Sequence, residues 1–131
     1  MRVIEKQMNQ AISKEIDWKK DNTEVINIEG VSFVYLYSNL IAMVGDTWLE
    51  IMDGGYKTST TKSRLNAILQ AHSNGEYVYQ KNFNWFISTK DGDVEFGNGI
   101  KLDWPLYSKG DSLMNETLKT QAVVEALEFY I

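Results

Sequence analysis

Apolar residues recur at helical spacing near the start of the chain. Four of them lie four residues apart: Ile4, Met8, Ile12 and Ile16. An apolar stripe with charged residues opposite it predicts an amphipathic helix over residues 1–20. The stripe can pack against its own domain or against a partner subunit, and the sequence leaves both alternatives open.

Residues 23–52 alternate between short apolar runs and pairs of turn-forming residues. The runs are Val25–Ile28, Ser32–Tyr37, Leu40–Val44 and Thr47–Met52. The pairs between them are Glu29-Gly30, Ser38-Asn39 and Gly45-Asp46. Such pairs are typical of tight turns between antiparallel strands, so the segment predicts a four-stranded meander. Its apolar residues fall on both faces of the sheet. Together with the N-terminal stripe, this predicts a homo-oligomer with the first helix in or near the interface.

The rest of the chain predicts two further helices and more strands. A helix is expected over residues 60–73, with Thr58 or Thr60 as its N-cap. Strand-like runs follow at Glu76–Lys81, Trp85–Thr89, Val94–Phe96 and Ile100–Leu102. Ser112 then caps a third expected helix, with apolar positions at Val123, Val124, Leu127 and Ile131. The predicted fold is α+β: one domain over residues 1–131, with an antiparallel meander sheet and N-terminal, central and C-terminal helices.

Composition limits the functional classes. A chain of 131 residues that is 44% hydrophobic can bury a core and is not disordered. The net charge of -5 argues against duplex nucleic acid, which binds mainly through lysine and arginine. With no cysteine there are no disulfides or thiolate–metal sites, and a reducing cytoplasm is the expected compartment. No apolar run is long enough for a membrane span, and no membrane partner is expected.

No catalytic or metal-binding signature stands out. His72 is the sole histidine, continues an apolar helical stripe and follows no Gly-x-Ser-x-Gly motif, so a structural role is favoured over a catalytic one. Asp91-Gly-Asp93-Val-Glu95 superficially suggests calcium, but it lacks EF-hand spacing and has the composition of a hairpin turn. We therefore predict no enzyme, no metal and no cofactor.

The segment from Asp53 to Asn66 is the strongest candidate for binding. It combines two glycines and several hydroxyl side chains with three cations: Lys57, Lys62 and Arg64. A loosened loop that enters a hydroxyl-capped helix favours anions through free amides and the helix dipole. We predict an anion site that includes Thr60, Lys62 and Arg64, with Arg64 on the solvent or ligand side of its helix. A surface salt bridge of Arg64 is the equal alternative.

A second candidate feature is aromatic. Phe83 and Trp85 share one face of a predicted strand, and Phe86 lies on the other. Such rings either fill a core or offer a platform on which a base can stack, and for any single ring the core is the better expectation.

The order of motifs resembles a bacteriophage family. The matching stretches lie within residues 23–90: Thr23–Val25, Val34–Ala42, Asp53–Tyr56, Thr60–Leu69 and Gln80–Ile87. They resemble the first-described viral Thoeris anti-defence proteins, which are sponges. The resemblance implies that the chain binds cyclic ADP-ribose isomers made by host TIR-domain enzymes and sequesters them without cleavage. Some members of that family also trap cyclic oligonucleotides.

The resemblance also implies site residues and a compartment. Phe83 or Trp85 would stack on the adenine, while Asn98, Lys101 and Asp103 would hold ribose and phosphate oxygens. Lys101 and Asp103 flank Leu102 on one strand face, so an ordinary ion pair is the alternative. The compartment would be the host cytoplasm. Two rival functions remain: an interaction module that inhibits a host enzyme, and a hydrolase of nucleotide signals.

Overall fold

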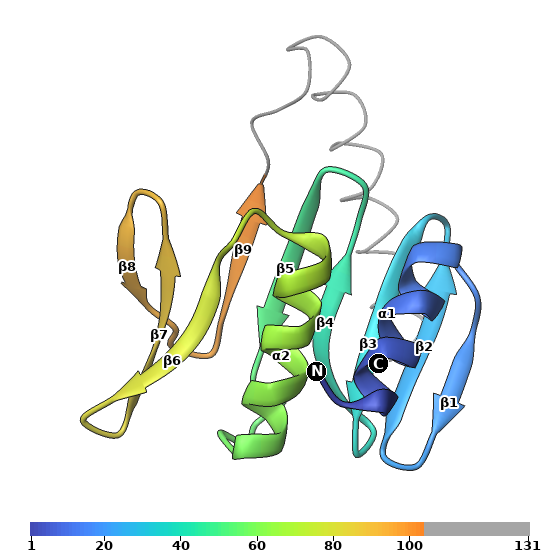
Figure 1. Cartoon of the computed structure of the whole chain (residues 1–131), viewed down its shortest axis with the longest axis horizontal. Coiled ribbons are helices and arrows are strands. Elements are labelled where there is room, and N and C mark those ends of the chain that lie inside the picture. The colour runs from blue at the N-terminus through green and yellow to red at the C-terminus, as the bar shows by residue number, and fades with distance from the viewer. Residues whose placement is uncertain (104–131) are drawn as a thin grey trace, which may run out of the picture.

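The computed structural model describes residues 1–103, which form two helices and nine strands (Figure 1). The helices are α1 (Val3–Lys14) and α2 (Ser59–His72). The first five strands are β1 (Trp18–Lys20), β2 (Thr23–Ile28), β3 (Val31–Leu36), β4 (Asn39–Val44) and β5 (Trp48–Met52). The remaining four are β6 (Tyr77–Lys81), β7 (Asn84–Thr89), β8 (Gly92–Glu95) and β9 (Gly99–Asp103).

The strands form two antiparallel sheets. Sheet A has the order β1-β2-β3-β4-β5-β9, and sheet B has the order β6-β7-β8. Sheet A therefore contains the predicted meander, extended by a strand at each edge. After β5 the chain forms α2 and all of sheet B before β9 returns to pair with β5, where Trp48 lies opposite Asp103.

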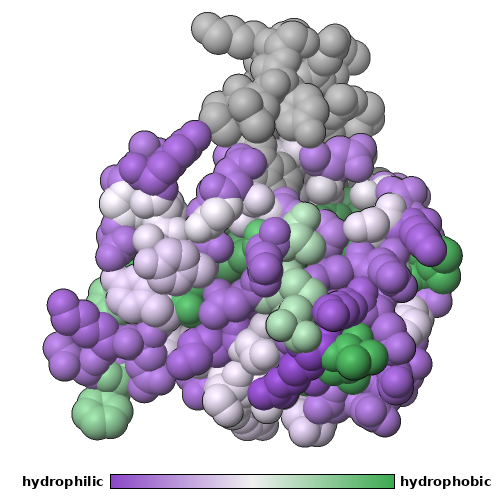
Figure 2. All heavy atoms as spheres, in the orientation of Figure 1, coloured by the Kyte–Doolittle hydropathy of each residue, from purple (hydrophilic) through white to green (hydrophobic). Residues whose placement is uncertain are grey.

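Both helices cover one face of sheet A, as Figure 1 shows. Met8 and Ile12 of α1 and Leu65 and Ile68 of α2 belong to one buried core with the strands beneath them. Full burial of such a side chain contributes roughly 1.5–3 kcal/mol to stability. The outer surface over the helices is mainly hydrophilic in Figure 2, with apolar residues scattered across it. Much of the N-terminal stripe is therefore used within its own domain.

The other face of sheet A is also apolar, as predicted. Alternation along the strands sends every second side chain away from the helices. These side chains form a second cluster of buried residues: Val31, Phe33, Met43 and Trp48. Half-buried side chains pack around them: Ile28, Tyr35, Leu40 and Met52. We call this surface the rear face.

The predicted fold class is wrong. The described residues are mostly β, with two helices and a system of six plus three strands, and they do not form a three-helix α+β fold with one meander. The prediction missed the pairing of β9 with β5 because no local signal encodes a contact between strands so far apart in the chain. The expected helix after Ser112 lies outside the described residues.

The first helix is also shorter than predicted. It ends at Lys14 because Glu15 adopts a left-handed conformation and the Ile16 amide bonds back to the Ala11 carbonyl at 2.9 Å. This is a Schellman-type stop. Trp18–Lys20 then gain ladder hydrogen bonds with β2 as an edge strand. Ile16, the last residue of the predicted stripe, is consequently 54% exposed.

Candidate functional site

Arg64 does not lie at a ligand surface, and this prediction is wrong. Its side chain is almost fully buried, and its Nη1 donates to Glu5 Oε2 at 2.8 Å. Its Nε donates to Thr23 Oγ1 at 3.1 Å, and its Nη2 donates to Asn22 Oδ1 at 3.3 Å. Each of the three guanidinium nitrogens thus donates a hydrogen bond inside the domain, and Glu5 neutralises the charge. Arg64 directly precedes the apolar residue Leu65, but the buried side of α2 already begins at Thr61 and includes Arg64.

Glu5 is the residue that sequence reasoning missed here. It reaches from α1 to α2: Oε1 accepts the Arg2 amide, and Oε2 accepts both Arg64 and the Ser63 hydroxyl, the latter at 2.6 Å. Burial raises the pKa of the Glu5 carboxyl. Hydrogen bonds from Ser63, the Arg2 amide and Arg64 outweigh burial, so this pKa lies below its ordinary 4.5. A Glu at the third position of a helix is a capping signal that could have drawn attention to it.

The predicted stacking pair is separated by the fold. Trp85 is only 3% exposed and packs edge-on against Phe96 with ring centroids 5.7 Å apart. It is a core residue, so its assignment as a stacking platform is wrong. Phe83 is 91% exposed, but it lies at the tip of the β6–β7 hairpin with a positive φ of 68°. Phe86 stacks on Tyr79 across the strands of sheet B.

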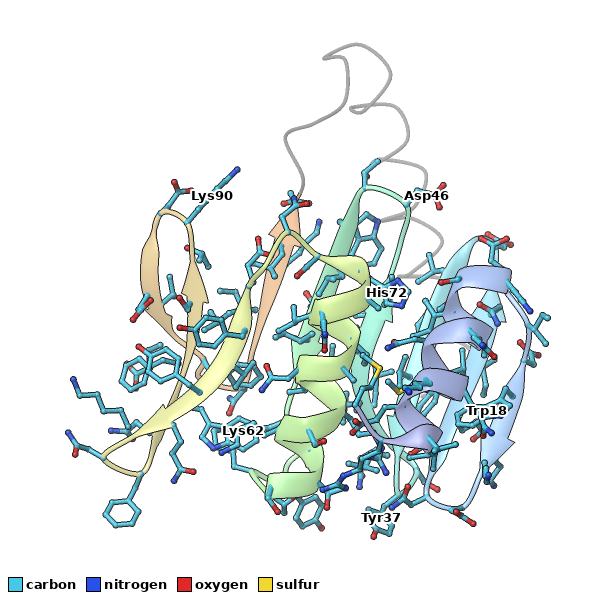
Figure 3. The ribbon with its side chains drawn as sticks, viewed as in Figure 1. Trp18, Tyr37, Asp46, Lys62, His72 and Lys90 are labelled. Carbon is cyan, nitrogen blue, oxygen red and sulfur yellow. The ribbon has the colours of Figure 1, made fainter. Side chains whose placement is uncertain are left out.

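The remaining predicted residues do not converge either. Lys101 and Asp103 share a face of β9 and approach each other at 3.9 Å as an exposed pair, which matches the ordinary ion-pair alternative. The Lys101 ammonium lies 5.3 Å from the Trp48 ring at the edge of the rear face. Asn98 is exposed in the turn before β9. Thr60 and Lys62 lie in the first turn of α2, and Figure 3 shows Lys62 on the side toward β6.

The structure instead forms a cavity at the N-terminal end of α2. Its volume is about 390 Å³, within the range of small-ligand pockets. We call it the α2 pocket. Its lining residues are Leu36, Tyr37, Asn39, Ile41, Asp53, Tyr56, Thr58 and Thr61. Two of them, Tyr37 and Tyr56, are large aromatics with 67% and 64% exposure. The pocket therefore has an apolar floor and two accessible rings.

Backbone geometry places both rings. Tyr37 occupies the β3–β4 turn with a positive φ of 51°, and its amide donates to the Asn22 carbonyl at 2.8 Å. Gly54, also at positive φ, lies so close to β4 that a Cβ there would be 3.0 Å from the Asn39 side chain. This close approach brings the loop carrying Tyr56 against the hairpin that carries Tyr37.

The predicted anion segment supplies several polar side chains of the pocket: Asp53, Thr58 and Thr61. Thr58 caps α2 by accepting the Thr61 amide at 3.1 Å, as the sequence predicted for Thr58 or Thr60. Asp53 accepts the Gly55 amide and the Lys57 ammonium, the latter at 2.5 Å. Burial raises the pKa of Asp53, but these two bonds outweigh it and hold the pKa below its ordinary 3.8. Lys57 also donates to the Gly97 carbonyl at 2.8 Å, which ties the loop to the turn before β9.

A second cavity lies at the opposite end of α2. Its volume is about 360 Å³. Its lining residues are Ile12, Ser13, Glu15, Gly30, Ser32, Val44, Gly45, Asp46, His72 and Asn74. Figure 3 shows His72 and Asp46 at this end and Tyr37 at the other. His72 Nε2 is buried without a hydrogen-bond partner among the described residues, and burial lowers the His72 pKa below its ordinary 6.5.

The described residues 1–103 contain neither a metal-ligand cluster nor a membrane-spanning helix. Within them, no three or more His, Cys, Asp or Glu side chains gather as a metal site. Neither described helix is long and apolar enough to cross a membrane.

Comparison with known proteins places the chain in a viral family. Residues 1–103 match the model of the Kyanoviridae Gp96 protein. The chain belongs to this family. It is therefore a bacteriophage protein, which confirms the phage origin implied by the resemblance. No curated protein and no solved structure matches the chain. The Thoeris assignment is not tested by the family match and stays a prediction.

Proposed function

We propose that this phage protein is a non-catalytic binder that sequesters a small nucleotide-derived ligand in the α2 pocket. The proposed ligand is of the cyclic ADP-ribose type, and the proposed compartment is the host cytoplasm. The phage family and the pocket geometry support this proposal. The two tyrosines, rather than Phe83 and Trp85, take the stacking role.

The observation that carries the proposal is the exposure of Tyr37 and Tyr56 beside an apolar floor. Stacking of a base on an aromatic ring contributes roughly 1–3 kcal/mol per base. Leu36 and Ile41 offer no hydrogen bond to a polar ligand, so the floor suits the face of a purine or ribose. Both tyrosines lie within or beside motifs that the sequence analysis singled out. Tyr37 directly precedes the turn pair Ser38-Asn39, and Tyr56 lies in the glycine-containing segment from Asp53 to Asn66.

The polar side of the pocket suits a phosphate and hydroxyl groups. The start of α2 carries the positive end of the helix dipole, which favours a phosphate nearby. The Thr58 and Thr61 hydroxyls bond to each other at 2.9 Å at this end and can reorient toward ribose or phosphate oxygens. The Asp53 carboxylate is neutralised by Lys57, so it opposes an anion less than an unpaired carboxylate would.

The proposal is tested by titrating the full chain with cyclic ADP-ribose in a calorimeter and comparing variants. Tyr56→Ala and Tyr37→Asn each remove one ring. Asparagine tolerates the positive φ at position 37, so the turn is kept. We expect each variant to bind at least about tenfold more weakly, which corresponds to about 1.4 kcal/mol.

Phe83→Gly is the matched control, because it removes an exposed ring from a positive-φ turn outside the pocket. Its affinity should equal that of the unchanged chain. If the tyrosine variants bind as tightly as the control, the α2 pocket is not the site.

Release of the ligand separates binding from the two rival functions. The chain is mixed with cyclic ADP-ribose and heat-denatured, and the filtrate is analysed by chromatography. We expect the free ligand to be depleted before heating and to be recovered intact in the filtrate afterwards. A cleaved product would indicate a hydrolase, and a ligand that is never depleted would leave an interaction module as the better explanation.

The proposed homo-oligomer is independent of the ligand. Much of the α1 stripe packs inside the domain, but Val3 on α1 and Ile16, which follows the end of α1, remain exposed. Light scattering at micromolar concentration measures the state directly, and a mass of 15.0 kDa would be that of a monomer.

A further inference from the structure

The two faces of sheet B differ in chemistry, and one of them packs on the core. Sheet B lies on the far side of α2 from α1 (Figure 1). Val78 of β6 and Trp85 and Ile87 of β7 belong to the core that both helices share with sheet A. Alternation along the strands sends the residues between them to the opposite side. We call this side the outer face of sheet B.

The outer face carries three neighbouring aromatic rings. Tyr77 and Tyr79 follow each other on this side of β6, with ring centroids 5.9 Å apart. Phe86 of β7 lies opposite Tyr79, and these two rings stack with centroids 5.6 Å apart. Tyr77 is 52% exposed, while Tyr79 and Phe86 are half-buried. Aromatic residues are enriched at protein interfaces, so an accessible group of three rings on one sheet face favours contact with a partner.

Two carboxylates border these rings on the third strand. Glu95 of β8 lies opposite Phe86, and Asp93 lies opposite Ser88. Both acidic residues are exposed, and Asp93 accepts a hydrogen bond from the Tyr79 hydroxyl. Among the described residues, neither carboxylate forms an ion pair with a lysine or an arginine. Negative charge therefore lies directly beside the rings.

We infer that the outer face of sheet B is a docking surface for a basic segment of another protein. A cationic side chain is attracted both to the face of an aromatic ring and to a nearby carboxylate, so the two features select the same chemistry. Arginine fits best, because its planar guanidinium stacks on aromatic rings and forms paired hydrogen bonds with a carboxylate.

The charges on the face argue against a nucleic acid as its occupant. Asp93 and Glu95 would repel phosphate groups, and the chain carries a net charge of -5. Lys81 lies at the β6–β7 end of sheet B, opposite Asn84, outside the strand pairs that include the two carboxylates. The inference does not rest on the proposed ligand, because the lining of the α2 pocket lies within residues 36–61.

Fluorescence anisotropy with labelled peptides tests the inference on the full chain. The probe is an octapeptide of alternating arginine and serine, and a peptide of alternating glutamate and serine controls for charge. Tyr77→Leu removes the most exposed of the three rings, and Glu95→Gln removes a charge while it keeps the side-chain length. The matched controls are Tyr56→Leu, an exposed ring of the α2 pocket, and Glu29→Gln, an exposed carboxylate between β2 and β3.

We expect the unchanged chain to bind the arginine peptide and not the glutamate peptide. Tyr77→Leu and Glu95→Gln should each weaken binding about two- to fivefold, the effect of one exposed cation–π contact or one exposed ion pair. Both controls should bind as the unchanged chain does. Unchanged affinity of Tyr77→Leu would overturn the inference. An equal loss in Glu29→Gln and Glu95→Gln would indicate general attraction to an acidic chain and would overturn it too.

Two other occupants of the outer face predict different results. A carbohydrate also stacks on aromatic rings, so maltoheptaose is titrated in parallel. Its binding, lost in Tyr77→Leu, without binding of the arginine peptide would overturn the inference. Self-association that light scattering detects and that Tyr77→Leu abolishes would assign the face to a second copy and would also overturn it.

Two further measurements keep the test decisive. If circular dichroism shows that Tyr77→Leu is unfolded, the comparison of Glu95→Gln with Glu29→Gln decides the result. Cyclic ADP-ribose should bind Tyr77→Leu as it binds the unchanged chain, so failure of the docking surface and failure of the α2 pocket are distinguishable.

Discussion

The two ends of α2 hold cavities of similar size and opposite chemistry. At the N-terminal end, the pocket of about 390 Å³ has an apolar floor of Leu36 and Ile41 and two exposed tyrosine rings. At the C-terminal end, the cavity of about 360 Å³ is lined largely by hydroxyl, amide and carboxylate groups around His72. The difference shows that cavity volume alone does not nominate a ligand site. Of these two cavities, the N-terminal one is lined by two exposed tyrosine rings on which a flat ligand can stack.

The two ends of α2 also differ in the partners of their ionisable side chains. The N-terminal end is fastened by two ion pairs, Arg64–Glu5 in the interior and Lys57–Asp53 nearer the surface. At the C-terminal end, His72 lacks a partner for Nε2 among the described residues. We therefore expect substitutions at the two ends to change stability by different amounts and over different pH ranges.

The largest expected effect comes from Glu5→Gln. The amide keeps the shape of the side chain but leaves the Arg64 charge buried without a counter-charge, and such a loss costs about 3–5 kcal/mol of unfolding free energy. Urea denaturation followed by circular dichroism measures the change. Glu15→Gln, at the exposed C-terminal end of α1, is the matched control and should be close to neutral. Equal stability of the two variants would show that the pair does not hold the N-terminal end together.

The effect of Glu5→Gln on stability should also depend on pH. The Glu5 pKa is lower in the folded chain than its ordinary 4.5, so its contribution is complete above about pH 4.5 and is lost as the pH falls through the folded value. The stability gap between the unchanged chain and Glu5→Gln should therefore narrow in acid below this pH. A gap that stays constant down to pH 3 would contradict the depressed pKa.

Substitution of His72 should change the pH dependence of stability by a smaller amount, and in a higher pH range than Glu5→Gln. Burial lowers its pKa below 6.5, so the unfolded chain binds a proton more readily and the contribution of neutral His72 is lost as the pH falls from 7 toward the folded pKa. His72→Gln should flatten the stability profile between about pH 7 and pH 5. Unfolding free energies at several pH values measure this. Ligand affinity at pH 7 should be unchanged in this variant, because the cavity at this end is not the proposed site.

The smallest expected effect comes from Lys57→Met. The Lys57 side chain is more than a third exposed, and surface ion pairs contribute about 0–1 kcal/mol. We expect a loss of less than about 1 kcal/mol, measured by urea denaturation. A loss as large as that of Glu5→Gln would mean that the bond to the Gly97 carbonyl, rather than the exposed pair, fastens this end of the molecule.

Part of the fold could be predicted because its signals are local. The turn pairs located β2 to β5 within a few residues, and the hydroxyl-rich segment located the cap of α2 at Thr58. The sequence also predicted that both faces of the meander sheet carry apolar residues. The spacing of Ile16 continues the stripe and predicts helix through Trp18–Lys20, whereas pairing with β2 decides the conformation of these residues.

The candidate site was predicted only in outline. The glycine and hydroxyl loop does form one wall of the α2 pocket, but Arg64 points inward to a carboxylate that lies far away in the sequence. The alternation of the sequence predicts that Phe83 and Trp85 share one face of a strand. In the structure Trp85 lies in the core, whereas Phe83 occupies a turn. Solvent exposure depends on what packs against each residue, and periodicity does not encode that partner.

The sequence by itself determined the local elements: where strands turn, where α2 begins, and that sheet A has two apolar faces. Hydrogen bonds between neighbouring residues and side-chain alternation are sufficient for those features. Only the tertiary structure decided that β9 closes the edge of β5, that Glu5 neutralises Arg64, and that Tyr37 and Tyr56 share one pocket. Each of these depends on contact between segments far apart in the chain, where the gain in burial and hydrogen bonding outweighs local preference.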